Sequence, residues 1–160
     1  MHGWLGATRI GPRLLAVALF LGWLTAPGTA RADAPVNAVY GLAIGGYDSV
    51  AYFPEGRARA GGARYLHLWN RVVWLFATPA NRDAFAAEPE RFAPRYGGFS
   101  AHGVANGAFY AIDPHAFLIA DGRLYLHANH YVKRLWTADL TANIARADAR
   151  WRRMTGAKKP

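Results

Sequence analysis

Histidines are the side chains of this 160-residue chain with the widest choice of chemistry. The chain contains no cysteine and two methionines, which excludes disulfides, zinc ribbons, iron–sulfur clusters and thiol nucleophiles. Any metal site must therefore use imidazole, carboxylate, thioether or backbone oxygen as ligands. Imidazole suits Zn(II), Cu(II) and Ni(II), whereas Cu(I) prefers sulfur ligands.

Three histidines, His102, His127 and His130, are candidate metal ligands. His127 and His130 are three residues apart in the segment HANH, and side chains at this spacing point to the same side of a helix. His102 follows the glycine pair Gly97-Gly98 and would join them if that loop meets the helix. The sequence thus predicts a site for a divalent transition metal, namely Zn, Cu(II) or Ni. The competing interpretation is a solvent-exposed polar segment, because no HExxH motif or four-ligand spacing is present.

The other downstream histidines are expected to be structural or solvated. His67 alternates with Tyr65 and Trp69 on one face of a predicted strand, so we expect it to be partly buried. His115 follows Asp113-Pro114 in a predicted turn and is expected to be solvated. Neither is assigned a functional role.

A Ser/His hydrolase is the least favoured reading of the segment Gly98-Phe99-Ser100-Ala101-His102. The nucleophile elbow G-x-S-x-G requires glycine where His102 stands. An orienting carboxylate would have to come from elsewhere, for example from Asp48. We therefore expect a protein that is not an enzyme.

Residues 1–32 have the features of a signal peptide. Arg9 and Arg13 precede an apolar run at 14–24, and Ala30-Arg31-Ala32 offers a cleavage site. The run is well short of the roughly twenty residues that span a bilayer. We expect an exported protein, periplasmic or secreted, that comprises residues 33–160 and does not span the membrane after cleavage.

The exported part is basic. Without the three leader arginines the chain keeps 16 basic and 10 acidic residues, a formal net charge of +6. We expect no nucleic-acid partner, because an exported protein does not meet intracellular nucleic acid and no RNP, KH or zinc-finger pattern is present. The basic C-terminal region indicates a solvated helix face with a basic tail, or attraction to anionic polymers or lipid headgroups.

Two β-hairpins are predicted from alternating apolar residues. The first covers residues 65–77 around Asn70-Arg71, and Arg71 is unfavourable there because a two-residue turn prefers glycine. The second covers residues 117–126 around Asp121-Gly122, a preferred type I′ pair. Residues 50–53 are predicted to form a short strand or a buried extended segment.

Helices are predicted between and after the hairpins. Thr78-Pro79 begins a helix that ends before Pro89, and residues 100–106 and 129–136 form two shorter helices. Asp139 caps a final amphipathic helix, whose apolar residues are spaced by three and four: Leu140, Ile144, Ala147, Trp151 and Met154. The expected fold is a small α+β single domain over residues 33–160, with two hairpins packed against three or four helices and a basic tail.

Several blocks, in this order, resemble the exported YHS-domain-containing proteins. The resemblance covers nearly all of residues 33–160. The blocks are GYDSVAYF at 46–53, WLF at 74–76, NRDAF at 81–85, PERFAPRYGG at 89–98 and DGRLYL at 121–126, followed by Trp136 and Trp151.

The resemblance implies a small α+β domain of a kind found among metal-binding modules. Where the family usually has cysteine after the Gly-Gly-aromatic turn, this chain has Ser100. His102 stands in place of the usual aromatic residue, and His127 in place of an asparagine. The soft ligand is thus absent, and two imidazoles stand in the motif.

The remaining motif residues are interpreted as a structural turn network. Aspartate caps backbone N–H groups and glycine permits positive φ. These residues are Tyr47, Asp48, Tyr96, Gly97 and Gly98.

The expected function is an exported YHS-like binding module that captures a metal, and the alternative is a metal-free interaction or structural domain that binds an envelope protein or anionic surface.

Overall fold

The first hairpin forms where the alternation predicts it. In the computed structural model, which describes residues 34–157, β3 (Gly62–Trp69) pairs antiparallel with β4 (Val72–Phe76). Asn70 and Arg71 both adopt positive φ, at 50° and 61°. The connection is therefore a two-residue turn, even though its second residue is arginine rather than the favoured glycine.

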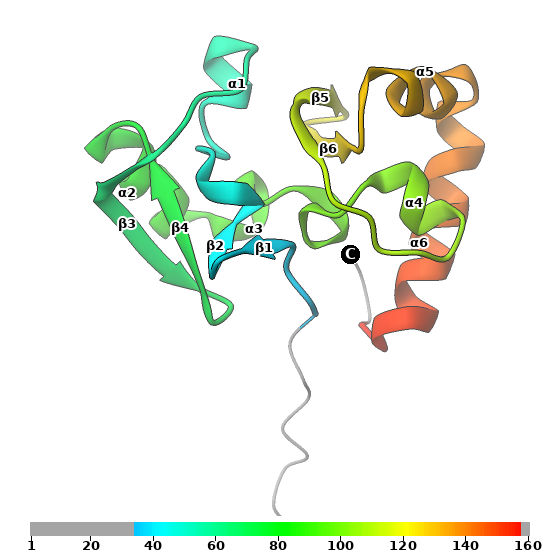
Figure 1. Cartoon of the computed structure of the whole chain (residues 1–160), viewed down its shortest axis with the longest axis horizontal. Helices are drawn as coiled ribbons and strands as arrows, with labels where there is room; N and C mark the ends of the chain where they lie inside the picture. Colours follow the sequence, from blue (N-terminus) through cyan, green and yellow to red (C-terminus); the bar gives the residue numbers. More distant parts are fainter. Residues whose placement is uncertain (1–33, 158–160) are drawn as a thin grey trace, which may run out of the picture. The chain divides into compact units, whose positions relative to one another are not determined.

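Two short strands extend this hairpin into a four-stranded sheet. They are β1 (Ala38–Val39) and β2 (Leu42–Ala43), and the strand order is β1-β2-β4-β3 with β2 parallel to β4 (Figure 1). A short 3₁₀ helix, η1 (Ile44–Gly46), follows β2 and leads into the segment around Asp48.

The strand predicted at residues 50–53 is wrong, because α1 (Tyr52–Glu55) occupies this segment. The Asp48 carboxylate accepts hydrogen bonds from the backbone N–H groups of Val50 (2.9 Å) and Ala51 (3.1 Å). These bonds satisfy N–H groups at the start of a helical turn, and Gly56 ends the turn in the left-handed conformation. A local cap thus outweighs the strand preference of the apolar side chains.

The helix predicted after Thr78 is confirmed. It is α2 (Pro79–Ala87), and the Thr78 hydroxyl accepts a hydrogen bond from the Asn81 backbone at 3.1 Å. The chain leaves the helical conformation before the next proline and begins α3 (Pro89–Phe92). The buried side chains of Phe85 and Phe92 anchor the two helices to the core.

The second half of the chain follows the predicted order of helix, hairpin and two helices. The turn of the second hairpin has positive φ at Asp121 and Gly122, as a type I′ turn requires. Asn129 and Asp139 cap the last two helices through their side chains. The elements are η2 (Arg95–Gly98), α4 (Ala101–Ala105), β5 (Asp113–Ala120), β6 (Arg123–His127), α5 (His130–Ala138) and α6 (Leu140–Thr155).

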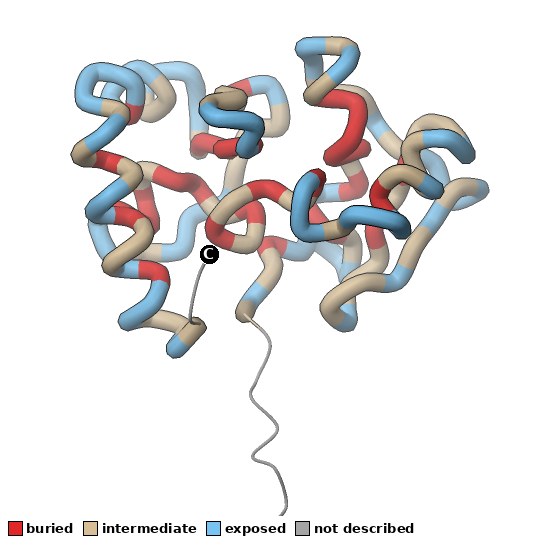
Figure 2. The backbone as a smooth tube through the Cα atoms, turned by 180° about the vertical axis from the view of Figure 1, so that it is seen from behind, coloured by how far each residue is buried: buried red, intermediate tan, exposed pale blue. Residues whose placement is uncertain are grey.

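Two hydrophobic clusters form the interior, and β6 contributes to both. The first lies around the four-stranded sheet and α2, and the second lies among α4, α5 and α6. Leu124 and Leu126 belong to the first cluster, whereas Tyr125 belongs to the second. Successive side chains of a strand point to opposite faces. Residues 124–127 are consequently all buried, and the interior is seen as the buried segments of Figure 2.

The expected α+β fold class is confirmed. The described residues contain six α-helices and two small sheets, of four and two strands. The number of helices exceeds the expected three or four because α1 and α3 are helices of four residues each. Residues 34–157 lie within one compact unit. The predicted signal peptide lies outside the described residues, and no helix within 34–157 is long and apolar enough to cross a membrane.

Candidate functional site

His127 is buried completely at the end of β6. Its exposed fraction is 0%, and its ring lies 5.6 Å from that of Trp136 between centroids. This burial follows from the alternation along β6, because His127 points to the same side as Tyr125, towards the second cluster. The prediction of a solvent-exposed polar segment is therefore wrong for His127.

His102 lies on α4, which meets the end of β6. The hydroxyl of Ser100, just before α4, accepts a hydrogen bond from the backbone N–H of Ala128 at 3.2 Å. Ser100 is two residues before His102, and Ala128 directly follows His127, so this bond holds the two histidine-bearing segments together. The structure thus brings His102 and His127 into one region, and the charge of His102 contributes to lowering the pKa of His127.

Three of the four ring nitrogens of this pair have no hydrogen-bond partner among residues 34–157. Both Nδ1 and Nε2 of His127 and Nδ1 of His102 are buried without a hydrogen bond, and so is Nε1 of Trp136. Buried polar atoms in native proteins are normally hydrogen-bonded, and each exception calls for an explanation. Unprotonated imidazole nitrogens are good metal ligands, so a metal ion is one group that fits them.

The surroundings of both imidazoles disfavour their protonated forms. Burial lowers the pKa of His127 to about 3, and the positive charge of Lys133, with that of His102 whenever it is protonated, acts in the same direction. Burial also lowers the pKa of His102, with a further contribution from Arg146. Protons therefore do not compete for the nitrogens of His127 at neutral pH, and the competition at His102 is weaker than at a solvated histidine. The positive charges of Lys133 and Arg146 oppose any cation held mainly by charge. The site therefore favours metals that bond strongly to nitrogen.

His130 does not share a helical turn with His127, contrary to the predicted spacing argument. His127 ends β6, and α5 begins only at His130, whose side chain is exposed. Within residues 34–157, no three side chains of histidine, aspartate or glutamate come together as a metal-binding group. The structure therefore brings together two of the three predicted ligands.

The Ser/His hydrolase interpretation lacks a hydrogen-bonded triad in the described part of the chain. The buried Ser100 hydroxyl accepts from Ala128, while Nδ1 of His102 has no partner. Asp48 is committed elsewhere, because its second carboxylate oxygen accepts from the Ala77 backbone (2.8 Å) and the Asn81 side chain (2.7 Å). Asp48 thus binds three backbone N–H groups, as the turn-network interpretation expects.

The tyrosine–glycine motif positions the loop before α4. The Tyr96 hydroxyl donates to Asp148 at 2.8 Å, and burial raises the pKa of Tyr96. Gly97 has a φ of 62°, and a Cβ atom there would lie 2.0 Å from the Pro35 carbonyl oxygen. The motif thus fixes the path that leads to Ser100. Tyr47, in the same predicted network, forms an isolated bridge with Ala60.

The remaining histidines lie apart from the pair. His67 is half-buried as predicted, and its ring contacts that of Phe85 at 6.0 Å. His115 is exposed as predicted, but it lies in β5 rather than in a turn.

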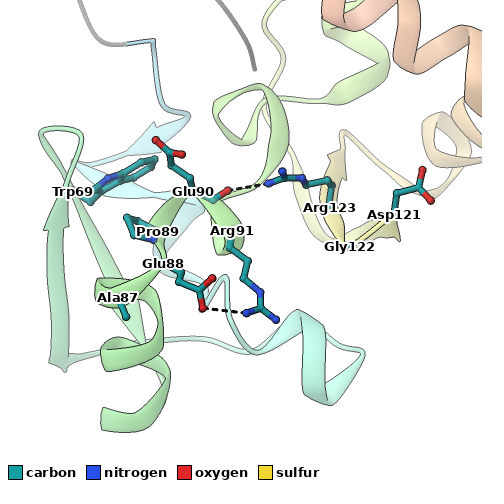
Figure 3. Close-up of a pocket in the computed structure, with 9 residues that line it drawn as sticks. All are labelled: Trp69, Ala87, Glu88, Pro89, Glu90, Arg91, Asp121, Gly122 and Arg123. Atoms are coloured by element: carbon teal, nitrogen blue, oxygen red, sulfur yellow. Dashed lines mark hydrogen bonds and ion pairs between the residues drawn. The ribbon is translucent and has the colours of Figure 1, made fainter.

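A cavity of about 690 Å³ lies next to Trp69, away from the histidine pair (Figure 3). Residues 87–91 and 121–123 complete its wall, and it contains neither His102 nor His127. Arg91 forms an ion pair with Glu88 at 3.0 Å, and Arg123 donates to the Glu90 carbonyl at 3.3 Å. A second cavity, of about 480 Å³, shares Trp69, Glu90 and Arg123 with the first.

Sequence reasoning missed Trp136, Lys133 and Arg146 as neighbours of the histidine pair. Trp136 is fully buried beside His127. The spacing of apolar residues in α5 and α6 indicated which residues face the core, but not which polar groups share their surroundings.

Comparison of the chain with protein-family models, curated proteins and solved structures finds no match.

Proposed function

We propose that this chain is an exported YHS-like binding module that captures a divalent transition metal through His102 and His127. The observation that carries the proposal is the set of three buried ring nitrogens without a hydrogen-bond partner. Support also comes from Ser100, whose hydrogen bond holds the two histidine segments together. The resemblance of the sequence blocks to the YHS family is consistent with this role.

The chemistry of the pair favours Cu(II) over Zn(II) and Ni(II). Affinities of nitrogen sites for divalent metals reach their maximum at Cu(II). The neighbouring charges of Lys133 and Arg146 oppose ionic binding, so the strength of the metal–nitrogen bond must provide the affinity. Two imidazoles would leave the remaining coordination positions to exchangeable ligands, which fits capture and transfer better than catalysis.

Calorimetric titration of residues 33–160 with CuCl₂, ZnCl₂ and NiCl₂ tests the proposal. These residues contain both hydrophobic clusters and every described helix and strand. We expect one metal per chain and at least a tenfold loss of affinity for His102→Ala and His127→Asn. His115→Ala, at an exposed site, is the matched control. His130→Ala measures whether the exposed third histidine contributes.

Two outcomes contradict the proposal. One is the absence of heat above the buffer signal with all three metals. The other is unchanged affinity in the His102→Ala variant, with a circular dichroism spectrum that confirms its fold. His102 is only half-buried, so this variant is expected to fold even if a change at His127 is not tolerated.

Export is a separate part of the proposal and has its own test. Cell fractionation of the full chain with and without residues 1–32 is expected to place the processed protein outside the cytoplasm only when the leader is present. Mass spectrometry of the exported form should give a start near Asp33. Retention of the leader on the exported protein would contradict cleavage.

A further inference from the structure

Three arginines form an exposed row on α6. Arg146, Arg150 and Arg153 are four and three residues apart, which places them on one side of the helix. We call this set the arginine stripe. No carboxylate within residues 34–157 forms an ion pair with it, although Arg146 donates a hydrogen bond to Asn143. The one acidic residue within α6, Asp148, pairs instead with Arg95 at 3.2 Å.

Two exposed aromatic side chains belong to a segment that reaches the stripe at Gly107. This segment lies between α4 and β5 and passes alongside α6 (Figure 1). A Cβ atom at Gly107 would lie 3.8 Å from the guanidinium of Arg150, and the Phe109 ring contacts the neighbouring Trp151 at 5.9 Å. Phe109 and Tyr110 nevertheless remain 41% and 57% exposed.

The fold holds these aromatic rings at the surface. The Phe109 ring stacks on Phe99 at 4.6 Å, which fixes its inner face. The Tyr110 ring covers Gly103, where a Cβ atom would approach within 2.6 Å of it. Ser100 also donates its backbone N–H to the Tyr110 carbonyl at 3.1 Å. The aromatic pair is therefore held in a fixed position at the surface, a few residues along the chain from the contact of Gly107 with Arg150.

We propose that the arginine stripe, Phe109 and Tyr110 together dock the domain on an anionic phospholipid surface. Arginines next to anionic headgroups gain Coulomb energy, and amphipathic aromatic rings prefer the boundary between headgroups and acyl chains. An acidic polymer would use the charges alone, whereas a lipid surface uses both features. Residues 33–160 carry a formal net charge of +6, and Lys158 and Lys159 add basic residues after α6 in the sequence. This docking does not require the proposed metal centre, although Arg146 belongs to the stripe and also lies near His102.

Vesicle sedimentation with residues 33–160 in the presence of EDTA tests the charge component. The vesicles contain phosphatidylcholine with phosphatidylglycerol, and pure phosphatidylcholine is the uncharged reference. A basic residue near an anionic leaflet contributes a factor of about five in partitioning, so Arg150→Gln/Arg153→Gln should bind about 30-fold more weakly. The matched control, Arg134→Gln/Arg152→Gln, removes the same charge away from the stripe and should retain most of the binding.

The aromatic component is tested with Tyr110→Ser against Tyr131→Ser, an exposed tyrosine on α5. Tyr110→Ser should weaken vesicle binding by about tenfold, and the control should leave it unchanged. Equal effects of the stripe and control charge variants would overturn the proposal, because net charge alone would then explain the binding. Binding to polyglutamate without vesicle sedimentation would also overturn it and would indicate a soluble acidic partner.

Discussion

Acidification should destabilise this fold through the buried imidazole of His127. The pKa of His127 is about 3 in the folded state, whereas a solvated histidine has a pKa near 6.5. Between these pH values the unfolded chain binds more protons than the folded chain, so stability falls as the pH decreases from about 6.5 to about 3. At pH 5 the unfolded imidazole is almost fully protonated while the buried one is neutral.

The free energy of unfolding should be about 2 kcal/mol lower at pH 5 than at pH 7.5. This value follows from proton linkage at one histidine, with a pKa of about 6.5 in the unfolded chain and about 3 in the folded chain. The pKa of His102 is also lowered, which adds to the loss in the same direction. Two kilocalories per mole is a large part of the 5–15 kcal/mol that is typical of a small domain. The effect should therefore be clear in equilibrium urea unfolding.

The assay compares urea unfolding of the metal-free protein with that of His127→Leu at both pH values. Leucine is close in size to histidine and leaves no unpartnered ring nitrogen beside Trp136. The variant should lose about 2 kcal/mol less than the natural chain between pH 7.5 and pH 5. His115→Asn, which removes an exposed imidazole, is the control. An equal loss in His127→Leu and the natural chain would refute the reasoning.

Two further predictions concern the turns that support the fold. Asp48→Ala removes the acceptor of three backbone N–H groups and of the Asn81 side chain. Thermal unfolding should therefore show a free energy of unfolding that is about 3 kcal/mol lower. A decrease below 1 kcal/mol would contradict the capping role. Gly97→Ala should cost more than Gly122→Ala in chemical denaturation, by about 2 kcal/mol, because both glycines have positive φ but only Gly97 lies against the Pro35 carbonyl. Equal costs would show that the contact relaxes freely.

Local sequence patterns predicted the turns and helix starts that are determined by residues close in the sequence. Asp121-Gly122 supplies the positive φ values of the second hairpin turn, and Thr78 and Asn129 cap the helices that follow them. The segment after Asp48 was predicted incorrectly because its capping bonds decide the conformation. Alternation of apolar residues gave no sign of those bonds.

The candidate site could be predicted only in part, because it depends on tertiary burial. The sequence identified His102 and His127, but a hairpin with one solvated face would have exposed the latter. Its burial arises because both faces of β6 are covered by different clusters. The helical spacing argument for His130 failed for a different reason, because the chain remains a strand as far as His127.

The position of β6 between the two clusters has a consequence for how the domain comes apart. Neither hydrophobic cluster can lose β6 without exposing apolar side chains of the other cluster. Removal of this strand therefore disrupts both clusters at once. Amide hydrogens of β6 that bond to β5 should accordingly exchange with solvent mainly through global opening, at rates among the slowest in the protein. Complementation by two fragments cut within residues 124–127 should fail, whereas a nick in the exposed Asp121-Gly122 turn should leave a reassociating pair.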